Sequence, residues 1–372
     1  MSEPFDAFRY AHAHRREIAW LSQNTNHLVP PEVVRGALEE AVTERRYEGY
    51  PLGSGDPELL ELIGNDLRLR GAPPFLTAGG TEALYMTMRA LLAAGDEVVA
   101  SDPSYLIIHK FIDIGGARPV CVDIYRPPYR LTAEWVAEQV GPHTKMIPLI
   151  DPLNPLGSGY PRDEVRAIAE IAHDRHLMLI NDVTYRDFSD GHALAAEFAP
   201  EQTVTVWSVS KNCGLAGLRL GGFSAIPELT RRIARFNTND LGVNILAQVA
   251  ARAALRTKPT WIAGVVRQTR ENCRRVHEVG RSVPGVTAPV APSRANMTIL
   301  DVAPTGVNPD ALQEELLRRH GVFVRAGSYL SPGHGRRFVR VSFSNPPADI
   351  DRFAGAFPEA MRALSARAVA AR

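Results

Sequence analysis

The chain has few cysteines, no long apolar run and almost no net charge. Its three cysteines, Cys121, Cys213 and Cys273, form no CxxC pair and no spaced cluster with histidine, so neither a disulfide framework nor a metal site is expected. No apolar run approaches the roughly 20 residues that cross a bilayer, and the N-terminus lacks the apolar core of a signal peptide. These absences predict a cytoplasmic protein without a membrane partner.

The charge balance gives no indication of a nucleic-acid partner. The formal net charge is +1, with 22% charged and 45% apolar residues, which is ordinary for a globular protein. A length of 372 residues exceeds one typical core, so we expect one large and one smaller domain.

Short β-rich runs alternate with amphipathic helical patterns through the middle of the chain. The helical patterns include Glu82–Ala94 and Arg162–Arg175. Strands that alternate with helices form a mostly parallel sheet with helices on both faces, so an α/β fold is predicted. Ligands of such sheets bind at the carboxyl ends of the strands. The expected strands are Val98–Ala100, Pro119–Ile124, Lys145–Ile150, Leu177–Ile180 and Thr203–Trp207.

The C-terminal part has a different pattern. Strands are expected at Met297–Val302 and Phe338–Phe343, with helices at Pro309–His320 and Asp349–Ala368, which predicts a smaller α+β domain. We therefore predict an N-terminal segment (1–40) that packs with the small domain, a large domain (41–255) and a small C-terminal domain (256–372).

Two polar residues follow apolar strands and are suited to cofactor chemistry. Lys211 is flanked by small residues in the run Ser208–Gly222, so its amine can be desolvated and form an imine. Asp182 ends another strand and can pair with a cofactor's ring nitrogen. The alternatives are a surface lysine in a glycine-rich loop and an aspartate that caps a helix.

Two further segments are compatible with a bound cofactor. Asn154 lies in the loop Asp151–Gly157, which two prolines and a glycine make rigid. Gly79, Gly80 and Thr81 open a helix, where backbone N–H groups can bind an anion. Taken alone, each segment is equally compatible with a plain turn or a helix cap.

The order and spacing of these four segments resemble the class I and II aminotransferases, the pyridoxal-phosphate enzymes of fold type I related to aspartate and histidinol-phosphate aminotransferases. The resemblance covers most of the chain. Its most specific elements are Ser208-x-Ser210-Lys211 followed by Gly-Leu-Arg219, and Asp182 with Tyr185 three residues later. It implies a mostly parallel central sheet with helices on both faces and a smaller α+β domain.

The resemblance also implies roles for individual residues. Lys211 forms a Schiff base with pyridoxal 5'-phosphate and moves the α-proton of the substrate. Asp182 keeps the ring nitrogen protonated, Asn154 and Tyr185 hydrogen-bond the ring's phenolic oxygen, and Tyr105 stacks on the ring. The phosphate group is held by Gly80, Thr81, Ser208, Ser210 and Arg219.

Two more residues match positions that contact substrate or the second subunit. Arg340 matches the arginine that binds the substrate α-carboxylate. Tyr50, in Tyr50-x4-Gly-x2-Glu-Leu, matches a tyrosine that reaches the phosphate in the neighbouring subunit. This match implies a homodimer with a shared active site.

Two segments depart from the family pattern. The loop 151–157 usually begins with Asn and carries Asn-Pro-Thr-Gly, whereas this chain has Asp151, Leu153 and Leu156. His27 lies in a segment that lines the substrate mouth in relatives. It is either a second acid/base group or substrate contact, or a solvated loop residue.

The leading hypothesis is an aminotransferase that acts on an α-amino acid and an oxo acid through Schiff-base and pyridoxamine intermediates. The alternative is a non-transaminating pyridoxal-phosphate enzyme of the same fold, which eliminates a β or γ substituent, cyclises, decarboxylates or oxidises an amino acid with dioxygen. A third hypothesis, a non-enzymatic effector domain, is disfavoured because every motif residue is present.

Overall fold

The computed structural model describes residues 5–370, and a seven-stranded sheet forms the core of its larger part. The strand order is β2-β8-β7-β6-β5-β3-β4, and β8 runs antiparallel to both of its neighbours. The predicted mostly parallel sheet is therefore confirmed. Its strands are β2 (Pro74–Thr77), β3 (Glu97–Asp102), β4 (Arg118–Asp123), β5 (Thr144–Ile150), β6 (Met178–Asp182), β7 (Thr203–Ser208) and β8 (Gly221–Ser224).

Helices surround this sheet, and both of the helices expected in this part of the chain form. The helix predicted at Glu82–Ala94 is Gly80–Leu91 in the structure and ends earlier because the chain turns at Leu92, whose backbone is extended. The Asp96 side chain stabilises the turn by accepting a hydrogen bond from the N–H of Ala93. The helices are α3 (Pro57–Leu67), α4 (Gly80–Leu91), α5 (Ile107–Ile114), α6 (Ala133–Gln139), α7 (Arg162–Asp174), α8 (Val209–Asn212) and α9 (Pro227–Ala234).

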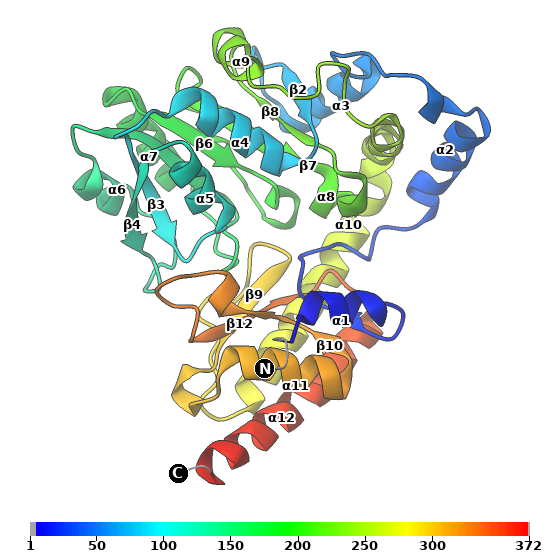
Figure 1. Ribbon diagram of the computed structural model, residues 1–372, viewed down its shortest axis with the longest axis vertical. Coiled ribbons are helices and arrows are strands. Elements are labelled where there is room, and N and C mark those ends of the chain that lie inside the picture. Colours follow the sequence, from blue (N-terminus) through cyan, green and yellow to red (C-terminus); the bar gives the residue numbers. More distant parts are fainter. Residues whose placement is uncertain (1–4, 371–372) are drawn as a thin grey trace.

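The 38-residue helix α10 (Ile245–Ser282) leads from the large part into a smaller one (Figure 1). Asn244 caps its start by accepting a hydrogen bond from the N–H of Ala247. The smaller part has an antiparallel sheet in the order β11-β12-β9. Its elements are β9 (Met297–Asp301), α11 (Pro309–His320), β11 (Arg325–Ala326), β12 (Phe338–Ser342) and α12 (Pro347–Ala370).

The N-terminal segment lies against both parts. After α1 (Ala7–Ala13), strand β1 (Ala19–Trp20) pairs in parallel with β10 (Val322–Phe323), and α2 (Glu32–Thr43) packs against α10. The domain boundary predicted at residue 255 falls inside the continuous helix α10. The three-segment division stays a prediction.

Single-turn helices occupy several connections. They are η1 (Arg46–Glu48), η2 (Arg186–Phe188), η3 (Ala195–Glu197), η4 (Ala216–Leu218), η5 (Ala303–Thr305) and η6 (Gly327–Tyr329).

The central strands bring the predicted functional residues to one edge of the sheet. Residues of β5, β6 and β7 are almost all buried, because helices cover both faces, and this explains their continuous apolar sequences. Ile150, the last residue of β5, pairs with Asp182 at the end of β6, and Asp182 pairs with Val206 near the end of β7. The three segments that leave these strands therefore start side by side.

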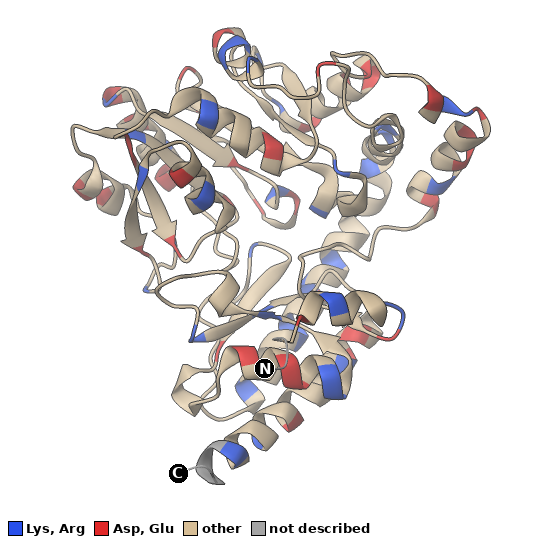
Figure 2. Ribbon diagram, viewed as in Figure 1, with Lys and Arg blue, Asp and Glu red and all other residues tan. Residues whose placement is uncertain are grey.

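Basic and acidic residues are interspersed over both parts of the molecule in the view of Figure 2. Of the helices described, none combines the length and apolar character needed to cross a membrane.

The contacts of β8 with its neighbours β2 and β7 leave no room for a side chain at Gly222. A Cβ atom there would lie 2.1 Å from the carbonyl oxygen of Phe75 and 2.4 Å from the ring of Trp207. We expect Gly222→Ala to lower the free energy of unfolding by about 1–3 kcal/mol, because neither neighbour can yield freely. Urea titration followed by circular dichroism measures this change.

Gly264→Ala is the matched control. This glycine lies inside α10, and its added Cβ would be 4.0 Å from the nearest atom, the flexible end of Arg267. The same change should raise stability by about 0.4–1 kcal/mol. Equal effects of the two substitutions would contradict the close-packing argument.

Candidate active site

A cavity of about 650 Å³ opens at the carboxyl ends of the central strands. The large part, the small part and the N-terminal segment all contribute to its lining. Most of the residues selected from the sequence meet there, and they are Gly80, Thr81, Tyr105, Asn154, Asp182, Tyr185, Ser208, Ser210, Lys211, Arg219 and Arg340.

One wall of the cavity is a cluster of hydrogen-bond donors at the start of α4. The N-cap residue of α4 is Gly79, which supplies no side-chain cap to the helix. The guanidinium of Arg219 lies so close that a Cβ atom on Gly79 would be 2.6 Å from its Nη2. Arg219 itself has a φ of +56°, an uncommon conformation for a residue with a side chain. Positive charge is thus held against the positive end of a helix, an arrangement that a bound anion stabilises.

Lys211 projects its amine into the cavity from α8. Its Nζ donates a hydrogen bond to the carbonyl oxygen of Gln23, at 2.8 Å. The side chain is partly exposed to the cavity, while protein atoms surround its amine. Burial, and then the positive charges of Arg340 and Arg219, lower the pKa of Lys211 to about 7. A large share of the amine is therefore neutral and nucleophilic at neutral pH.

Asp182 is the cavity's buried carboxylate. It is 6% exposed, and its Oδ1 accepts hydrogen bonds from the N–H and the hydroxyl of Thr184, at 3.0 and 2.6 Å. Among residues 5–370, no hydrogen bond reaches Oδ2. Burial raises the pKa of Asp182, although the bonds from Thr184 oppose the shift. A cationic ring N–H in the cavity would give this carboxylate a partner.

Arg340 connects the cavity floor to two other segments. Its Nη1 donates to Asn154 Oδ1 at 2.7 Å, and its Nη2 donates to the carbonyl oxygen of Ser22. Its Nε is buried without a partner in the described structure. Burial lowers the pKa of Arg340 to about 10, so it remains a cation at neutral pH.

Two predicted residues lie outside this cavity. Tyr50 is 81% exposed and lies away from the cavity of its own subunit. His27 is exposed, and its Nε2 lies 2.7 Å from the hydroxyl oxygen of Thr25. Packing around its ring, and then the charges of Arg15 and Lys211, lower the pKa of His27. The predicted roles of both residues stay predictions.

The structure adds residues that the predicted set omitted. Gln23 and Asn24 line the cavity where His27 was expected, and Asn24 Nδ2 donates to the hydroxyl of Tyr185 at 3.0 Å. Arg325 and Lys110 also line it. The sequence does carry a signal for Asn24, since asparagine tolerates the positive φ of +54° found there.

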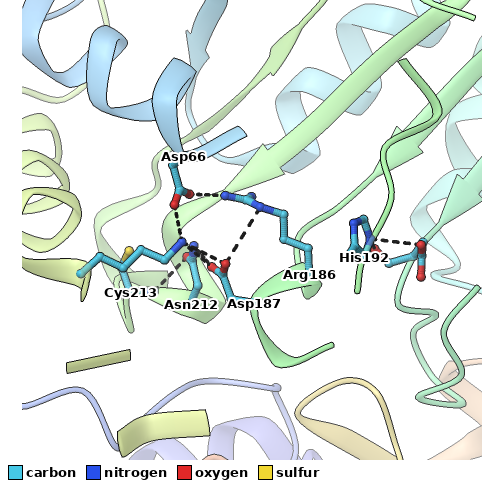
Figure 3. A network of polar contacts seen from close by, with 8 residues as sticks. Asp66, Arg186, Asp187, His192, Asn212 and Cys213 are labelled. Atoms are coloured by element: carbon cyan, nitrogen blue, oxygen red, sulfur yellow. Dashed lines mark hydrogen bonds and ion pairs between the residues drawn. The ribbon is translucent and has the colours of Figure 1, made fainter. Parts of the chain in front are cut away.

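A charged network lies behind the active-site segments (Figure 3). Asp66 pairs with Arg186 and with Lys258, whose Nζ also contacts Asp187 at 2.9 Å. Asp187 Oδ2 accepts a hydrogen bond of 2.6 Å from Asn212, the neighbour of Lys211. These residues, except for Asn212, border a surface groove of about 1110 Å³ that shares no lining residue with the cavity.

The profile of the family described as aminotransferase class I and II matches residues 16–357. The chain belongs to this family. The predicted family, fold and aminotransferase activity are thereby confirmed. Class I and II aminotransferases depend on pyridoxal phosphate.

Individual relatives support this assignment. The chain is 27% identical to an aspartate aminotransferase of Pyrococcus horikoshii, over 84% of this chain and 82% of the relative. It is 31% identical to an arginine–pyruvate transaminase of Pseudomonas aeruginosa, over 70% of this chain and 68% of the relative. A crystal structure of an aminotransferase from Mycobacterium tuberculosis shares the fold, with a TM-score of 0.84, 24% identity and 96% coverage of each chain.

The lowered pKa of Lys211 is open to a direct test. We expect the rate at which Lys211 forms an imine with a small aromatic aldehyde to rise with pH and level off above about 7, because the neutral amine is the nucleophile. Borohydride trapping followed by peptide mass spectrometry measures the rate at this site.

Arg340→Met should move the midpoint toward the ordinary lysine pKa, because it removes a positive charge that contributes to the shift. Arg340→Lys keeps the charge and is the control. An unchanged midpoint in Arg340→Met would show that Arg340 does not act on the amine.

Proposed function

We propose that the chain binds pyridoxal 5'-phosphate in this cavity, with the predicted site residues in the roles that the family resemblance implies, and transfers an amino group between an α-amino acid and an oxo acid. The observation that carries the proposal is the placement of two groups in one cavity. The pKa of the Lys211 amine is lowered to about 7, and the Asp182 carboxylate is buried without a cationic partner among the described residues.

The donor set of the cavity fits the cofactor. Its phosphate requires an anion site, and Arg219 beside the uncapped start of α4 offers bidentate contacts next to backbone N–H groups. Ser208 and Ser210 add hydroxyl groups to the same wall. The free Oδ2 of Asp182 suits a protonated ring nitrogen. The half-buried ring of Tyr105, whose hydroxyl lies 3.4 Å from Thr81 Oγ1, supplies a face for an aromatic ring.

Pyridoxal phosphate, when bound, supplies the aldehyde that exchanges amino groups and the ring that accepts electrons from the substrate's α-carbon. The chain's own residues do the rest. Lys211 accepts and returns the proton at the α-carbon, which a pKa near 7 suits at neutral pH. Asp182 holds the proton on the ring nitrogen. Arg340 orients the α-carboxylate, and Asn154, which accepts a bond from Arg340, fixes that guanidinium.

We propose further that the substrate carries a second anionic group. Arg325 is 8% exposed, lies 3.8 Å from the ring centroid of Tyr329 and 4.1 Å from that of Phe8, and forms no ion pair with an acidic side chain in the described structure. A buried cation without a counter-ion is costly, so it favours an anionic ligand. Lys110, which forms no ion pair among residues 5–370, adds a second cation to the lining. These charges favour an acidic side chain, as the aspartate aminotransferase among the relatives handles, over a basic one.

A homodimer with a shared active site belongs to the proposal. Large apolar side chains are exposed at Tyr47, Tyr50, Leu52 and Leu241, and the segments 51–53 and 240–242 touch one another. Such a contiguous apolar surface favours a second copy of the chain, into whose cavity Tyr50 would reach. The predicted cytoplasmic location is compatible with the free state of the three cysteines.

The absorbance of the purified holoenzyme tests the transamination. We expect the band of the bound cofactor to shift when a donor amino acid is added under air, and to return when an oxo acid is added next. Lys211→Ala should bind the cofactor and show no turnover. Release of ammonia or peroxide without an oxo acid would contradict transamination and favour a non-transaminating reaction of the same fold.

Substitution of Arg325 tests the substrate class. Arg325→Met should lower kcat/KM for aspartate or glutamate roughly 10- to 100-fold, since a hydrogen bond between charged groups is worth about 1.5–3 kcal/mol. The value for alanine, which has no distal charge, should change little. Arg325→Lys keeps the charge, so its kcat/KM for aspartate or glutamate should fall less than that of Arg325→Met. Equal losses for aspartate and alanine would show that Arg325 acts only through the fold.

A further inference from the structure

Asp151 is a buried carboxylate at the start of the active-site loop 151–157. It is 1% exposed, and it stands where the resemblance leads one to expect a neutral asparagine. Its N–H donates to the carbonyl oxygen of Asp182, and its Oδ1 accepts a bond of 3.2 Å from the N–H of Tyr160. A buried carboxylate that is ionised is costly unless a cation lies beside it.

His192 is the basic group beside this carboxylate. Its Nε2 lies 3.0 Å from Asp151 Oδ2 (Figure 3). The hydrogen bond of the ring goes to the carbonyl oxygen of Asp151, at 2.9 Å, so Oδ2 has no hydrogen-bond partner among the described residues and depends on the charge of the ring. Within residues 5–370, no other basic side chain forms an ion pair with Asp151. His192 also borders the surface groove, so it can exchange protons with solvent without passing through the active-site cavity.

The loop that starts at Asp151 is short and tightly bonded. The N–H of Leu153 donates to the carbonyl oxygen of Ser158, and the N–H of Gly157 donates to that of Leu153, both at 2.7 Å. Asn154 lies inside this tight turn and accepts the bond from Arg340. A shift of the loop's first residue is therefore passed on to Asn154.

We propose that His192 is a positioning residue whose charge, paired with Asp151, fixes the loop that holds Asn154 against Arg340. The pair thereby connects proton uptake in the surface groove to the geometry of the cavity. The part that concerns Asn154 rests on the proposed function, whereas the pairing itself does not.

The surroundings of His192 give the expected direction of the pH response. Burial acts to lower the pKa of His192, but the hydrogen bond and the charge of Asp151 outweigh it and raise the pKa, against the charge of Arg186. The other charged groups that border the groove near it are Asp187, Asp190, Glu197, Arg162 and Arg270. Because the folded pKa is raised above 6.5, the pair's stabilisation is complete below pH 6.5 and is lost as the pH rises through the folded pKa.

A double-mutant cycle tests the pairing. His192→Gln retains a donor near the position of Nε2 but carries no charge, so it leaves Asp151 uncompensated. We expect a melting temperature several degrees lower at a fixed cofactor concentration, and a roughly tenfold higher KM for the amino acid. Asp151→Asn also removes the pair but buries no unpaired charge, so both of its losses should be smaller than those of His192→Gln. The double variant Asp151→Asn/His192→Gln should then lose no more than Asp151→Asn alone. Additive effects would overturn the proposal.

The pH dependence separates a charge pair from simple packing. Between pH 6 and 9, the melting temperature of the wild type should fall as the pH rises and the pair loses its charge. This contribution to the fall should be absent from Asp151→Asn and from the double variant. Equal slopes in all forms would also overturn the proposal. The melting temperature can be measured without turnover, so the two claims can fail separately. If the melting temperatures of the variants are non-additive but the protein has no transaminase activity, only the proposed function is wrong. If the protein is an active transaminase but the melting temperatures are additive, only the pairing is wrong.

Discussion

The main constraint on this structure is that one cavity holds several cationic side chains with only one acidic side chain among the described residues of its lining. Arg219, Arg325 and Arg340 line the same space as the Lys211 amine, and Asp182 is the acid that faces them. Burial, together with the charges of Arg340 and Arg219, lowers the pKa of Lys211 to about 7, a shift that an acidic neighbour in direct contact would oppose. The unbalanced charge favours anionic ligands. Anything that binds only the folded state also stabilises it, so cofactor and substrate contribute to the stability of the cavity that binds them.

Behind the cavity the charges are balanced instead. Asp66 and Asp187 face Arg186 and Lys258, and Asp151 faces His192. Each of these clusters touches a segment that carries an active-site residue: Asn212 follows Lys211, Arg186 follows Tyr185, and Asp151 precedes Asn154. Paired charges fix directions as well as distances. These pairs therefore help to hold the segments that carry Lys211, Tyr185 and Asn154.

The parts of the site that could be predicted from the sequence are those in which a strand and its functional residues are close together in the chain. The apolar strands β5, β6 and β7 and the polar residues at their carboxyl ends are contiguous in sequence, so strand ends and side chains were found together. Strands β2 and β8 were missed because they are short, and β8 begins with two glycines whose pairing depends on the close approach of Phe75 and Trp207. His192 escaped for a related reason. Its significance lies in Asp151, which is 41 residues away in the chain, a separation that no periodicity indicates.

The N-terminal segment shows why proximity to a motif is a weak guide to a side chain's direction. His27 was preferred for its chemistry, yet Gln23 and Asn24 face the cavity because β1 pairs with β10 and fixes the register of the residues after it. Asn24 is held further by Ser342, whose hydroxyl donates to Asn24 Oδ1 at 2.7 Å and accepts a bond of 2.8 Å from the Asn24 N–H. The carbonyl oxygen of Gln23 accepts the hydrogen bond from the Lys211 amine. The N-terminal segment is therefore bonded both to the small part, through Ser342, and to the Lys211 amine of the large part.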